Sequence, residues 1–194
     1  MALYSIILSA GKSSRMGSDK AFLQIEGKTW LDTIIEKIQP VSAGICLVSG
    51  SNHQKLQNHK YNFPVRIVHN TTPELGMFSS LKLAINTLNT ASHALIHLID
   101  HPLICPETYL KIVAALDDQH QIFMPALASE KRSGHPIIIN RQVMDMIIAA
   151  PLSANLHDII IALPVDKLKR IPVTDRHILD NINTPGQFRS QINS

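Results

Sequence analysis

Apolar runs alternate with amphipathic segments along the chain, and this alternation predicts its elements. Short, nearly continuous apolar runs are typical of buried strands, whereas apolar residues spaced three and four apart indicate one face of a helix. By these criteria we predict strands over residues 4–8, 44–48, 65–69, 94–99, 122–125, 136–139, 168–173 and 178–182. We predict helices over residues 29–38, 52–59, 79–88, 106–116, 143–149, 156–163 and 185–192.

The order of these elements predicts the fold class. Strands that alternate with helices indicate an α/β protein with a mainly parallel sheet. The sequence shows no internal repeat, low-complexity tract or linker, so we expect residues 1–194 to form one domain. Ligands of such sheets bind beyond the carboxyl ends of the strands. The loops after residues 8, 69, 99 and 182 are therefore where a functional site is expected.

Composition narrows the class of protein. The chain is 45% hydrophobic and 17% charged, which is ordinary for a globular protein. No apolar run approaches the roughly 20 residues that a membrane-spanning helix needs, and we predict no signal peptide and no membrane association. Cys46 and Cys105 lack paired spacing, so we expect reduced thiols and a cytoplasmic protein. With a net charge of +3 and 5% aromatic residues, we expect no nucleic-acid partner.

Small and basic residues fill the loop after the first predicted strand. Residues 8–20 read Leu-Ser-Ala-Gly-Lys-Ser-Ser-Arg-Met-Gly-Ser-Asp-Lys. Small residues let backbone N–H groups approach a polyphosphate, while Arg15 can pair with phosphate oxygens and Lys20 can supply a positive charge. The glycine spacing matches neither a Walker A loop nor a dinucleotide fingerprint. From the residues alone, this segment is either a phosphate-binding loop of another kind or a solvated loop.

Asp100 directly follows the apolar run over residues 94–99. A carboxylate at the end of a buried strand is a suitable ligand for Mg²⁺, which takes phosphate and water as its other ligands. A helix cap or a turn is the alternative, although Pro106 opens the next predicted helix six residues later. His101, the next residue, could orient a phosphate or simply fill a variable position.

Five ordered motifs together resemble those of the MobA-like NTP transferase family. The first loop is similar to Leu-x-x-Gly-x-Ser-x-Arg-Met-Gly-x-x-Lys, through Leu8, Gly11, Ser13, Arg15, Met16, Gly17 and Lys20. Two further strings resemble the family's Gly-Met-x-Ser-Ser-Leu and Asp-x-Pro-Leu motifs, namely residues 76–81 and 100–103. Two more resemble the Gly-His-Pro string of the cytidylyltransferase branch and an Asp/Asn-x-Asp/Asn-Thr-Pro motif, namely residues 134–136 and 181–185.

The resemblance implies a fold and an activity. The implied fold is a three-layer α/β/α sandwich with a mixed, mainly parallel sheet, Rossmann-like and similar to A-type glycosyltransferases. The implied activity is Mg²⁺-dependent transfer of a nucleoside monophosphate from an NTP to a small phosphorylated acceptor, with release of pyrophosphate. Transfer from CTP to molybdopterin comes first, because of the Gly-His-Pro string. The alternatives are guanylyl transfer in the same pathway and transfer to a sugar or alditol phosphate. A further alternative is a non-catalytic accessory protein that binds a nucleotide or carries molybdopterin to a partner molybdoenzyme.

The resemblance also implies roles for individual residues. The catalytic residues are Arg15, Lys20 and Asp100, and the metal ligands are Asp100 and Asn183, with Asp180 as the alternative to Asn183. The nucleotide-binding residues are Leu8, Ser9, Ala10, Gly11, Lys12, Ser13, Gly17, Gly76, Ser79 and Ser80. The acceptor-binding residues are His101, Gly134, His135 and His157. From the residues alone, Ser79 and Ser80 could instead cap a helix, and Thr184 could cap another while Asn183 binds the metal.

One position departs from the family's pattern. The family often has an arginine in the helix after the Gly-His-Pro strand, and here His157 occupies that position. Histidine is shorter than arginine and only partly charged near pH 7. If that arginine holds an acidic acceptor, the acceptor of this protein differs.

Overall fold

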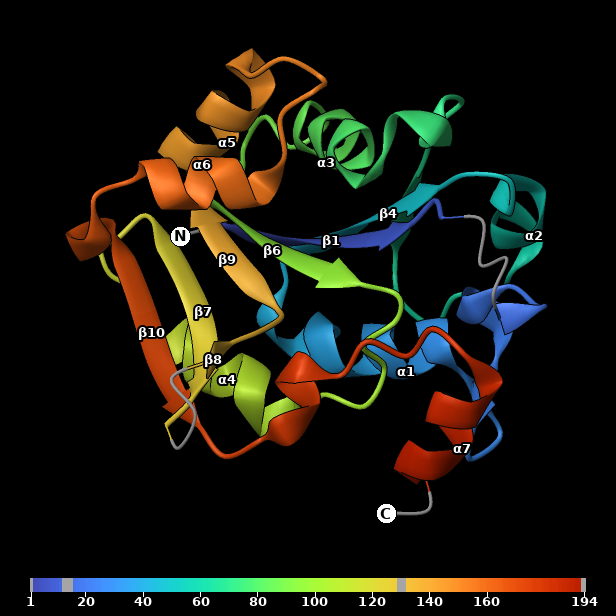
Figure 1. Ribbon diagram of the computed structural model, residues 1–194. Coiled ribbons are helices and arrows are strands. Elements are labelled where there is room, and N and C mark those ends of the chain that lie inside the picture. Colours follow the sequence, from blue (N-terminus) through green and yellow to red (C-terminus); the bar gives the residue numbers. More distant parts are fainter. Residues whose placement is uncertain (1, 12–15, 129–131, 193–194) are drawn as a thin grey trace.

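A computed structural model describes residues 2–11, 16–128 and 132–192. Its core is an eight-stranded sheet in which seven strands follow the order β10-β7-β9-β6-β1-β4-β5, and β8 pairs with β7 (Figure 1). The strands are β1 (Leu3–Ser9), β4 (Gly44–Ser49), β5 (Val65–His69), β6 (His93–Leu98), β7 (Ile122–Leu127), β8 (Arg132–Ser133), β9 (Ile137–Asn140) and β10 (Leu168–Val173). β8 and β9 are antiparallel to their partners, and the other pairs of this sheet are parallel. The predicted mixed, mainly parallel sheet is therefore confirmed.

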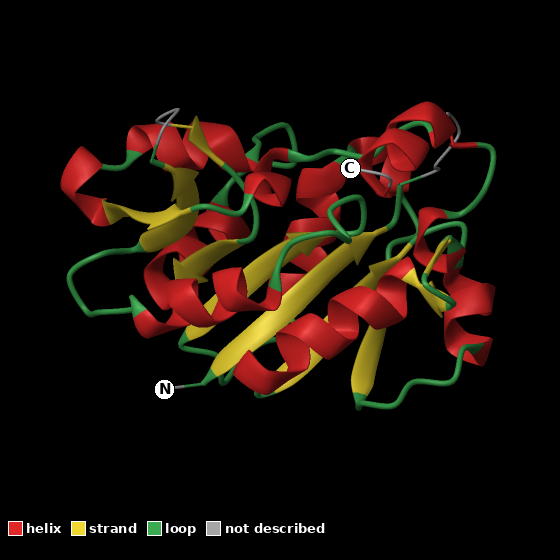
Figure 2. Cartoon of the chain, turned by 90° about the horizontal axis from the view of Figure 1, so that it is seen from below, coloured by secondary structure: helices red, strands yellow, loops and turns green. Residues whose placement is uncertain are grey.

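Helices cover both faces of the sheet (Figures 1 and 2). α3 (Met77–Ile85), α5 (Arg141–Ala149) and α6 (Leu156–Ala162) pack on one face, and α1 (Trp30–Ile38) and α4 (Pro106–Ala114) on the other. Each face of the sheet has its own hydrophobic core. Ile6 and Leu8 of β1 pack toward α3, α5 and α6, whereas Leu3 and Ile7 pack toward α1 and α4. This division follows from the period of two along a strand. In the described part of the chain, each helix is too short or too polar to cross a membrane.

The remaining elements lie mostly around the carboxyl ends of the strands. They are the helices α2 (His53–Asn58) and α7 (Pro185–Ile192), the hairpin β2 (Gln24–Ile25) and β3 (Lys28–Thr29), and short 3-10 helices that include η2 (Lys20–Phe22) and η6 (Arg176–Leu179). α7 packs against α1 through Phe188 and Trp30, whose ring centroids are 5.0 Å apart. The connection from β1 to α1 thus lies beside the end of the chain, which brings the first loop close to Asn183.

The strand predicted over residues 178–182 is wrong. This segment holds the end of η6 and an irregular stretch, because its apolar residues are buried in two different clusters: Ile178 in the core beneath α1 and α4, and Ile182 beside Trp30. Its backbone makes single hydrogen bonds, from His135 N to Ile178 O (2.9 Å) and from Ile182 N to Asp100 O (3.1 Å). A short apolar run cannot distinguish such a segment from a strand.

The helix predicted over residues 79–88 begins and ends earlier, at Met77 and Ile85. Gly76 precedes it with a φ of 90°, a left-handed conformation that glycine adopts without strain. No side chain caps this helix at its N-terminus, so the alternative in which Ser79 or Ser80 caps it is wrong.

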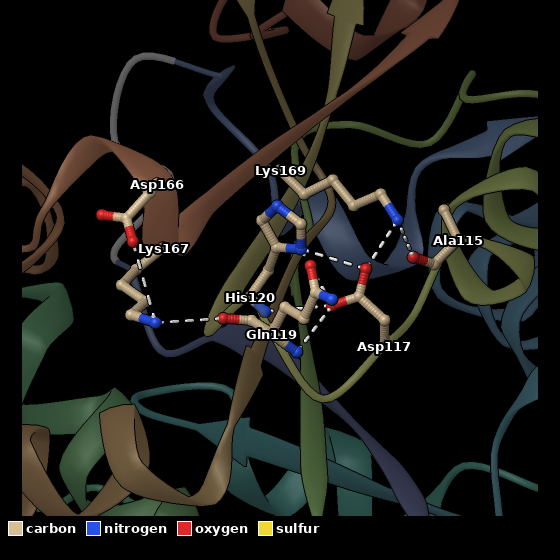
Figure 3. A network of polar contacts seen from close by, with 7 residues as sticks. All are labelled: Ala115, Asp117, Gln119, His120, Asp166, Lys167 and Lys169. Carbon is tan, nitrogen blue, oxygen red and sulfur yellow. Dashed lines mark hydrogen bonds and ion pairs between the residues drawn. The ribbon is translucent and has the colours of Figure 1, made fainter.

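Polar contacts attach the edge strand β10 to the connection between α4 and β7 (Figure 3). Lys169 Nζ donates to Ala115 O at 2.8 Å and to Asp117 Oδ2 at 2.7 Å. His120 Nδ1 lies 2.8 Å from Asp117 Oδ1. The hydrogen bonds from Lys169 and His120 hold the pKa of the Asp117 carboxyl well below its usual range. These contacts fix the sheet edge farthest from β5.

Candidate functional site

Three polar side chains from distant parts of the sequence meet beyond the carboxyl end of β6. Lys20 begins η2, Asp100 follows β6, and Asn183 precedes α7. Lys20 Nζ donates to Asn183 Oδ1 at 2.7 Å and to Asp100 Oδ2 at 3.3 Å. The lysine is only 7% exposed, so its charge is directed at these two oxygens and not at bulk water. The three residues form the centre of the candidate site.

The segment around Asn183 is fixed to the end of β6. Ile182 N donates to Asp100 O at 3.1 Å, and the Ile182 side chain is fully buried. Asn183 Nδ2 donates to Asn181 Oδ1 at 2.5 Å, which turns Asn183 Oδ1 toward Lys20. Thr184 Oγ1 accepts from Gln187 N at 3.3 Å, the capping contact predicted for Thr184. The alternative ligand Asp180 instead contacts His177 Nδ1 at 2.6 Å.

The oxygens of this cluster fit a hard divalent cation. Asp100 Oδ1 is buried and has no hydrogen-bond partner in the described structure. A buried carboxylate oxygen without a partner is costly, and a cation would satisfy it. The described residues hold no group of three or more His, Cys, Asp or Glu suited to a metal. A cation here would therefore take further ligands from phosphate and water, as Mg²⁺ does.

Asn52, which follows β4, connects both ends of the first loop. Its Nδ2 atom lies 3.2 Å from Ser9 O, 3.2 Å from Ser9 Oγ and 3.3 Å from Asp19 Oδ1. Its Oδ1 accepts from Gly50 N at 3.1 Å. Asp19 Oδ1 also accepts from Ala21 N at 3.1 Å and so caps η2, which begins at Lys20. Asn52 thus positions the residue that directly precedes Lys20.

Asn70, which follows β5, has the corresponding role for the turn that begins α3. It is buried, and its Nδ2 donates to Ser79 Oγ at 3.0 Å and to Ser80 Oγ at 2.9 Å. Ser79 Oγ donates in turn to Gly76 O at 2.8 Å. These two hydroxyls therefore fix the shape of the turn, and their contact with a nucleotide stays a prediction.

A cavity of about 510 Å³ lies between α3, α6 and the strands β1, β6 and β9. Leu8, Gly76, His135 and His157, all predicted to contact substrate, line it together. The rest of its described lining is mostly apolar and includes no Lys, Arg, Asp or Glu. The His157 side chain is 79% exposed, so it lies at the rim of the cavity. Such a cavity suits an uncharged, largely apolar part of a ligand.

Two neutral histidines lie between Asp100 and the cavity. The rings of His101 and His135 are 5.1 Å apart, and His101 Nε2 is 3.8 Å from Asp100 Oδ1. Burial lowers the pKa of His101 and lowers that of His135 to about 4. Nδ1 of each ring is buried without a partner in the described structure. Since a neutral imidazole carries one acceptor nitrogen, both rings can accept a hydrogen bond from a ligand.

The other predicted site residues have different surroundings. Gly11 and Gly17 are exposed, and Gly17 has a φ of 70°. Ser9 and Ala10 are buried, so they can offer a ligand little beyond their backbone. Gly134 packs against Ile178, whose oxygen would lie 2.1 Å from an added Cβ. Three of the predicted residues lie outside the described part of the chain: Lys12, Ser13 and Arg15.

Sequence reasoning missed Asn52, Asn70, Gly50 and Asp19. A Cβ at Gly50 would lie 2.3 Å from Ala10 O, so the turn after β4 touches the first loop directly. The available signal was positional, because Asn52 and Asn70 each follow a predicted strand at its carboxyl end. The predicted helix over residues 52–59 begins at Asn52, which does precede the observed helix, but its side chain bonds the first loop and not the helix.

Comparisons with known proteins identify the family of this chain. A family model described as the MobA-like NTP transferase domain matches residues 5–167. The chain is 29% identical over 188 residues to a molybdenum cofactor cytidylyltransferase of Escherichia coli (strain K12), covering 96% of this chain and 94% of the relative. It is 26% identical over 191 residues to a probable molybdenum cofactor guanylyltransferase of Flavobacterium johnsoniae, covering 96% and 94%.

Solved structures share the fold. The chain is similar to Rv0371c from Mycobacterium tuberculosis H37Rv, with a TM-score of 0.83 at 17% identity and with 100% of this chain and 99% of that chain covered. A crystal structure of Rv0371c in complex with manganese gives a TM-score of 0.79 at 16% identity, with 100% of both chains covered. At this level of identity the likeness shows the three-layer fold alone.

Proposed function

This chain belongs to the MobA-like NTP transferase family, and we propose that it transfers a nucleoside monophosphate from an NTP to a small phosphorylated acceptor, releasing pyrophosphate. The observation that carries this proposal is the convergence of Lys20, Asp100 and Asn183 beyond the carboxyl end of β6, the strand whose residues Ile96 and Leu98 also line the cavity of about 510 Å³. The buried ammonium group of Lys20 can stabilise negative charge on phosphate oxygens, and the oxygens of Asp100 and Asn183 can bind a metal ion. Ligands of such folds bind at this end of the sheet.

In the proposed reaction, an acceptor phosphate oxygen attacks the α-phosphorus, and the bond to the leaving pyrophosphate breaks in line. Such a reaction needs positioning and charge stabilisation more than covalent catalysis by the protein. Lys20, and Arg15 from the first loop, would neutralise charge on the phosphates. Asp100 and Asn183 would hold Mg²⁺, which supplies further positive charge to the phosphate oxygens when bound.

The cavity is proposed as the acceptor site. Both His135, whose Nδ1 atom is buried, and His157, which borders the rim, line it, and both are predicted to bind the acceptor. We favour CTP as the nucleotide and molybdopterin as the acceptor, supported by the Gly-His-Pro string at residues 134–136 and by the Escherichia coli relative. Guanylyl transfer is the second candidate, because the Flavobacterium johnsoniae relative matches as much of the chain.

Nucleotide-dependent thermal stabilisation tests this proposal. CTP, GTP, UTP and ATP, each with Mg²⁺, would be compared on wild type, Asp100→Ala and the control Asp166→Ala. Asp166 is exposed and contacts Lys167 at 3.8 Å, away from the site. A ligand at about 100 times its Kd adds roughly 2.7 kcal/mol to the stability of the folded state.

We expect CTP to raise the melting temperature of wild type and Asp166→Ala but not of Asp100→Ala. A response to GTP alone would replace the cytidylyl assignment by the guanylyl one. If no nucleotide stabilises wild type, or if Asp100→Ala responds as wild type does, the proposed site is wrong.

A further inference from the structure

We propose that the ammonium group of Lys20 occupies the divalent-cation position in the nucleotide-free protein, so that a cation enters this site only together with the triphosphate. This inference rests on the proposed function and assigns Lys20 a second role in it. In the absence of nucleotide, Lys20 keeps the metal out. Once nucleotide binds, the same lysine serves the phosphates.

The first support is that Lys20 is bonded to the two oxygens proposed as metal ligands. Its Nζ atom is 2.7 Å from Asn183 Oδ1 and 3.3 Å from Asp100 Oδ2. Mg²⁺ binds its oxygens at about 2.0–2.1 Å. A cation that took both oxygens would lie in the space that Nζ fills, and two positive charges would meet there with little water between them. The lysine and the cation therefore compete for the same pair.

The second support is that neighbouring contacts hold this arrangement in place. Asp19 caps the helix that Lys20 begins, and Asn52 holds Asp19 through a contact of 3.3 Å. On the opposite side, Asn181 fixes the amide orientation that turns Asn183 Oδ1 toward the lysine. Lys20 and Asp100 are both shielded, with side-chain exposures of 9% and 17%. The position of Lys20 is therefore fixed by its surroundings, unlike that of an exposed lysine that forms an ion pair at the protein surface.

Binding of the triphosphate would draw the ammonium group of Lys20 away from Asp100 and Asn183. Lys20 ends the first loop, where the phosphates are proposed to bind, so an anion there offers its ammonium group a stronger partner than an amide oxygen. When Lys20 turns to the phosphates, Asp100 Oδ2 and Asn183 Oδ1 become free for the cation. Binding of the cation and of the nucleotide are then coupled, and the coupling is reciprocal. The buried Asp100 Oδ1 has no partner in the described structure and would gain one at the same time.

The test is the affinity for Mn²⁺ without nucleotide, measured from the loss of the free-ion signal in electron paramagnetic resonance. Wild type would be compared with Lys20→Met, whose side chain is unbranched and one atom shorter than that of lysine and carries no charge. Lys169→Met is the matched control, because Lys169 also joins a half-buried ion pair (2.7 Å from Asp117) but lies on the edge strand β10. The double variant Lys20→Met/Asp100→Ala shows whether any gain arises at this site.

We expect Lys20→Met to bind Mn²⁺ about tenfold or more tightly than wild type, a size typical of coupling between two sites. Lys169→Met should match wild type, and the double variant should lose the gain. Equal Mn²⁺ affinity of wild type and Lys20→Met would overturn the inference, since it would mean that the ammonium group of Lys20 does not compete with the cation.

A measurement on wild type alone keeps the inference testable if Lys20→Met does not fold. Millimolar Mn²⁺ without nucleotide should leave the melting temperature of wild type unchanged, whereas CTP or GTP with Mn²⁺ should raise it. A rise with Mn²⁺ alone contradicts the inference. If neither nucleotide with Mn²⁺ stabilises wild type, the proposed function fails, and the inference fails with it. If Mn²⁺ alone raises the melting temperature as much as nucleotide with Mn²⁺ does, the inference is overturned but the proposed function is not.

Discussion

Asn52→Ala is expected to disconnect the first loop from the sheet. The Asn52 side chain is 92% buried, since its exposed fraction is 8%, and it contacts Ser9, Asp19 and Gly50. Alanine removes every one of these contacts while leaving the backbone free to keep its conformation. The loop that precedes Lys20 would then lose the side-chain contacts that join its two ends, Ser9 and Asp19, to the turn after β4.

The expected loss of stability follows from these contacts. The amide of Asn52 has two N–H hydrogens, shared among three acceptors, and one oxygen that accepts from Gly50 N at 3.1 Å. Counting three hydrogen bonds at about 1 kcal/mol each gives a loss of roughly 3 kcal/mol in the free energy of unfolding. Asn140→Ala is the matched control, because Asn140 is also a helix N-cap but makes one such contact, with Val143 N at 3.1 Å. Its removal should cost about 1 kcal/mol.

Urea unfolding followed by circular dichroism measures both losses, and calorimetry with CTP or GTP and Mg²⁺ measures the effect on the site. We expect Asn52→Ala to bind nucleotide about tenfold more weakly, which corresponds to 1.4 kcal/mol, and Asn140→Ala to bind as wild type does. The reasoning is refuted if the two variants lose the same stability, or if Asn52→Ala is destabilised yet keeps the nucleotide affinity of wild type.

Three further predictions concern stability. Gly134→Ala should lower the free energy of unfolding by about 1–3 kcal/mol, because its Cβ would lie 2.1 Å from a carbonyl oxygen of η6. Gly186→Ala is the control and should not lower it, since the added Cβ meets its nearest neighbour at 4.0 Å. Equal urea midpoints of the two variants would contradict this account. Burial lowers the pKa of His135 to about 4 from a usual 6.5, so the unfolded state binds more protons between these values, and stability should be complete above pH 6.5 and decline toward pH 4. His135→Gln should flatten this decline in urea titrations, and an unchanged slope would show that His135 is not its source. Lys169→Met removes the contact of 2.7 Å with Asp117 and should cost about 1 kcal/mol in 0.1 M salt, so a variant as stable as wild type would mean that the network in Figure 3 does not hold β10.

Most of the fold could be predicted because its strands are covered on both faces. β5 (Val65–His69) and β10 (Leu168–Val173) have the predicted bounds, and most other strands differ by one or two residues. The exception, residues 178–182, shows the limit of the method. Buried segments are apolar both in strands and in irregular structure. An apolar run alone therefore does not show whether its backbone pairs with a neighbouring strand.

Only some residues of the candidate site could be predicted from the sequence. Asp100 could be found because it directly follows an apolar run, where a carboxylate is a suitable ligand for Mg²⁺. The resemblance to a family connected it with Lys20 and Asn183. The family prediction is confirmed, since the family model matches residues 5–167. Asn52 could not be found, because its side chain is defined by partners up to 43 residues away and a single asparagine in a loop carries no signal of its own. The competition between Lys20 and a cation likewise depends on distances that no motif contains.

The most direct test of the proposed function is acceptor-dependent release of pyrophosphate. Purified protein would be incubated with Mg²⁺, molybdopterin and either CTP or GTP, and pyrophosphate and the dinucleotide product would be quantified together. We predict equal amounts of the two products with one of these nucleotides, none without acceptor, and a rate at least about 100-fold lower in Asp100→Ala. Nucleotide binding without any pyrophosphate release in the presence of molybdopterin would contradict the proposed transfer to this acceptor and favour a protein that binds or carries its ligands without reaction.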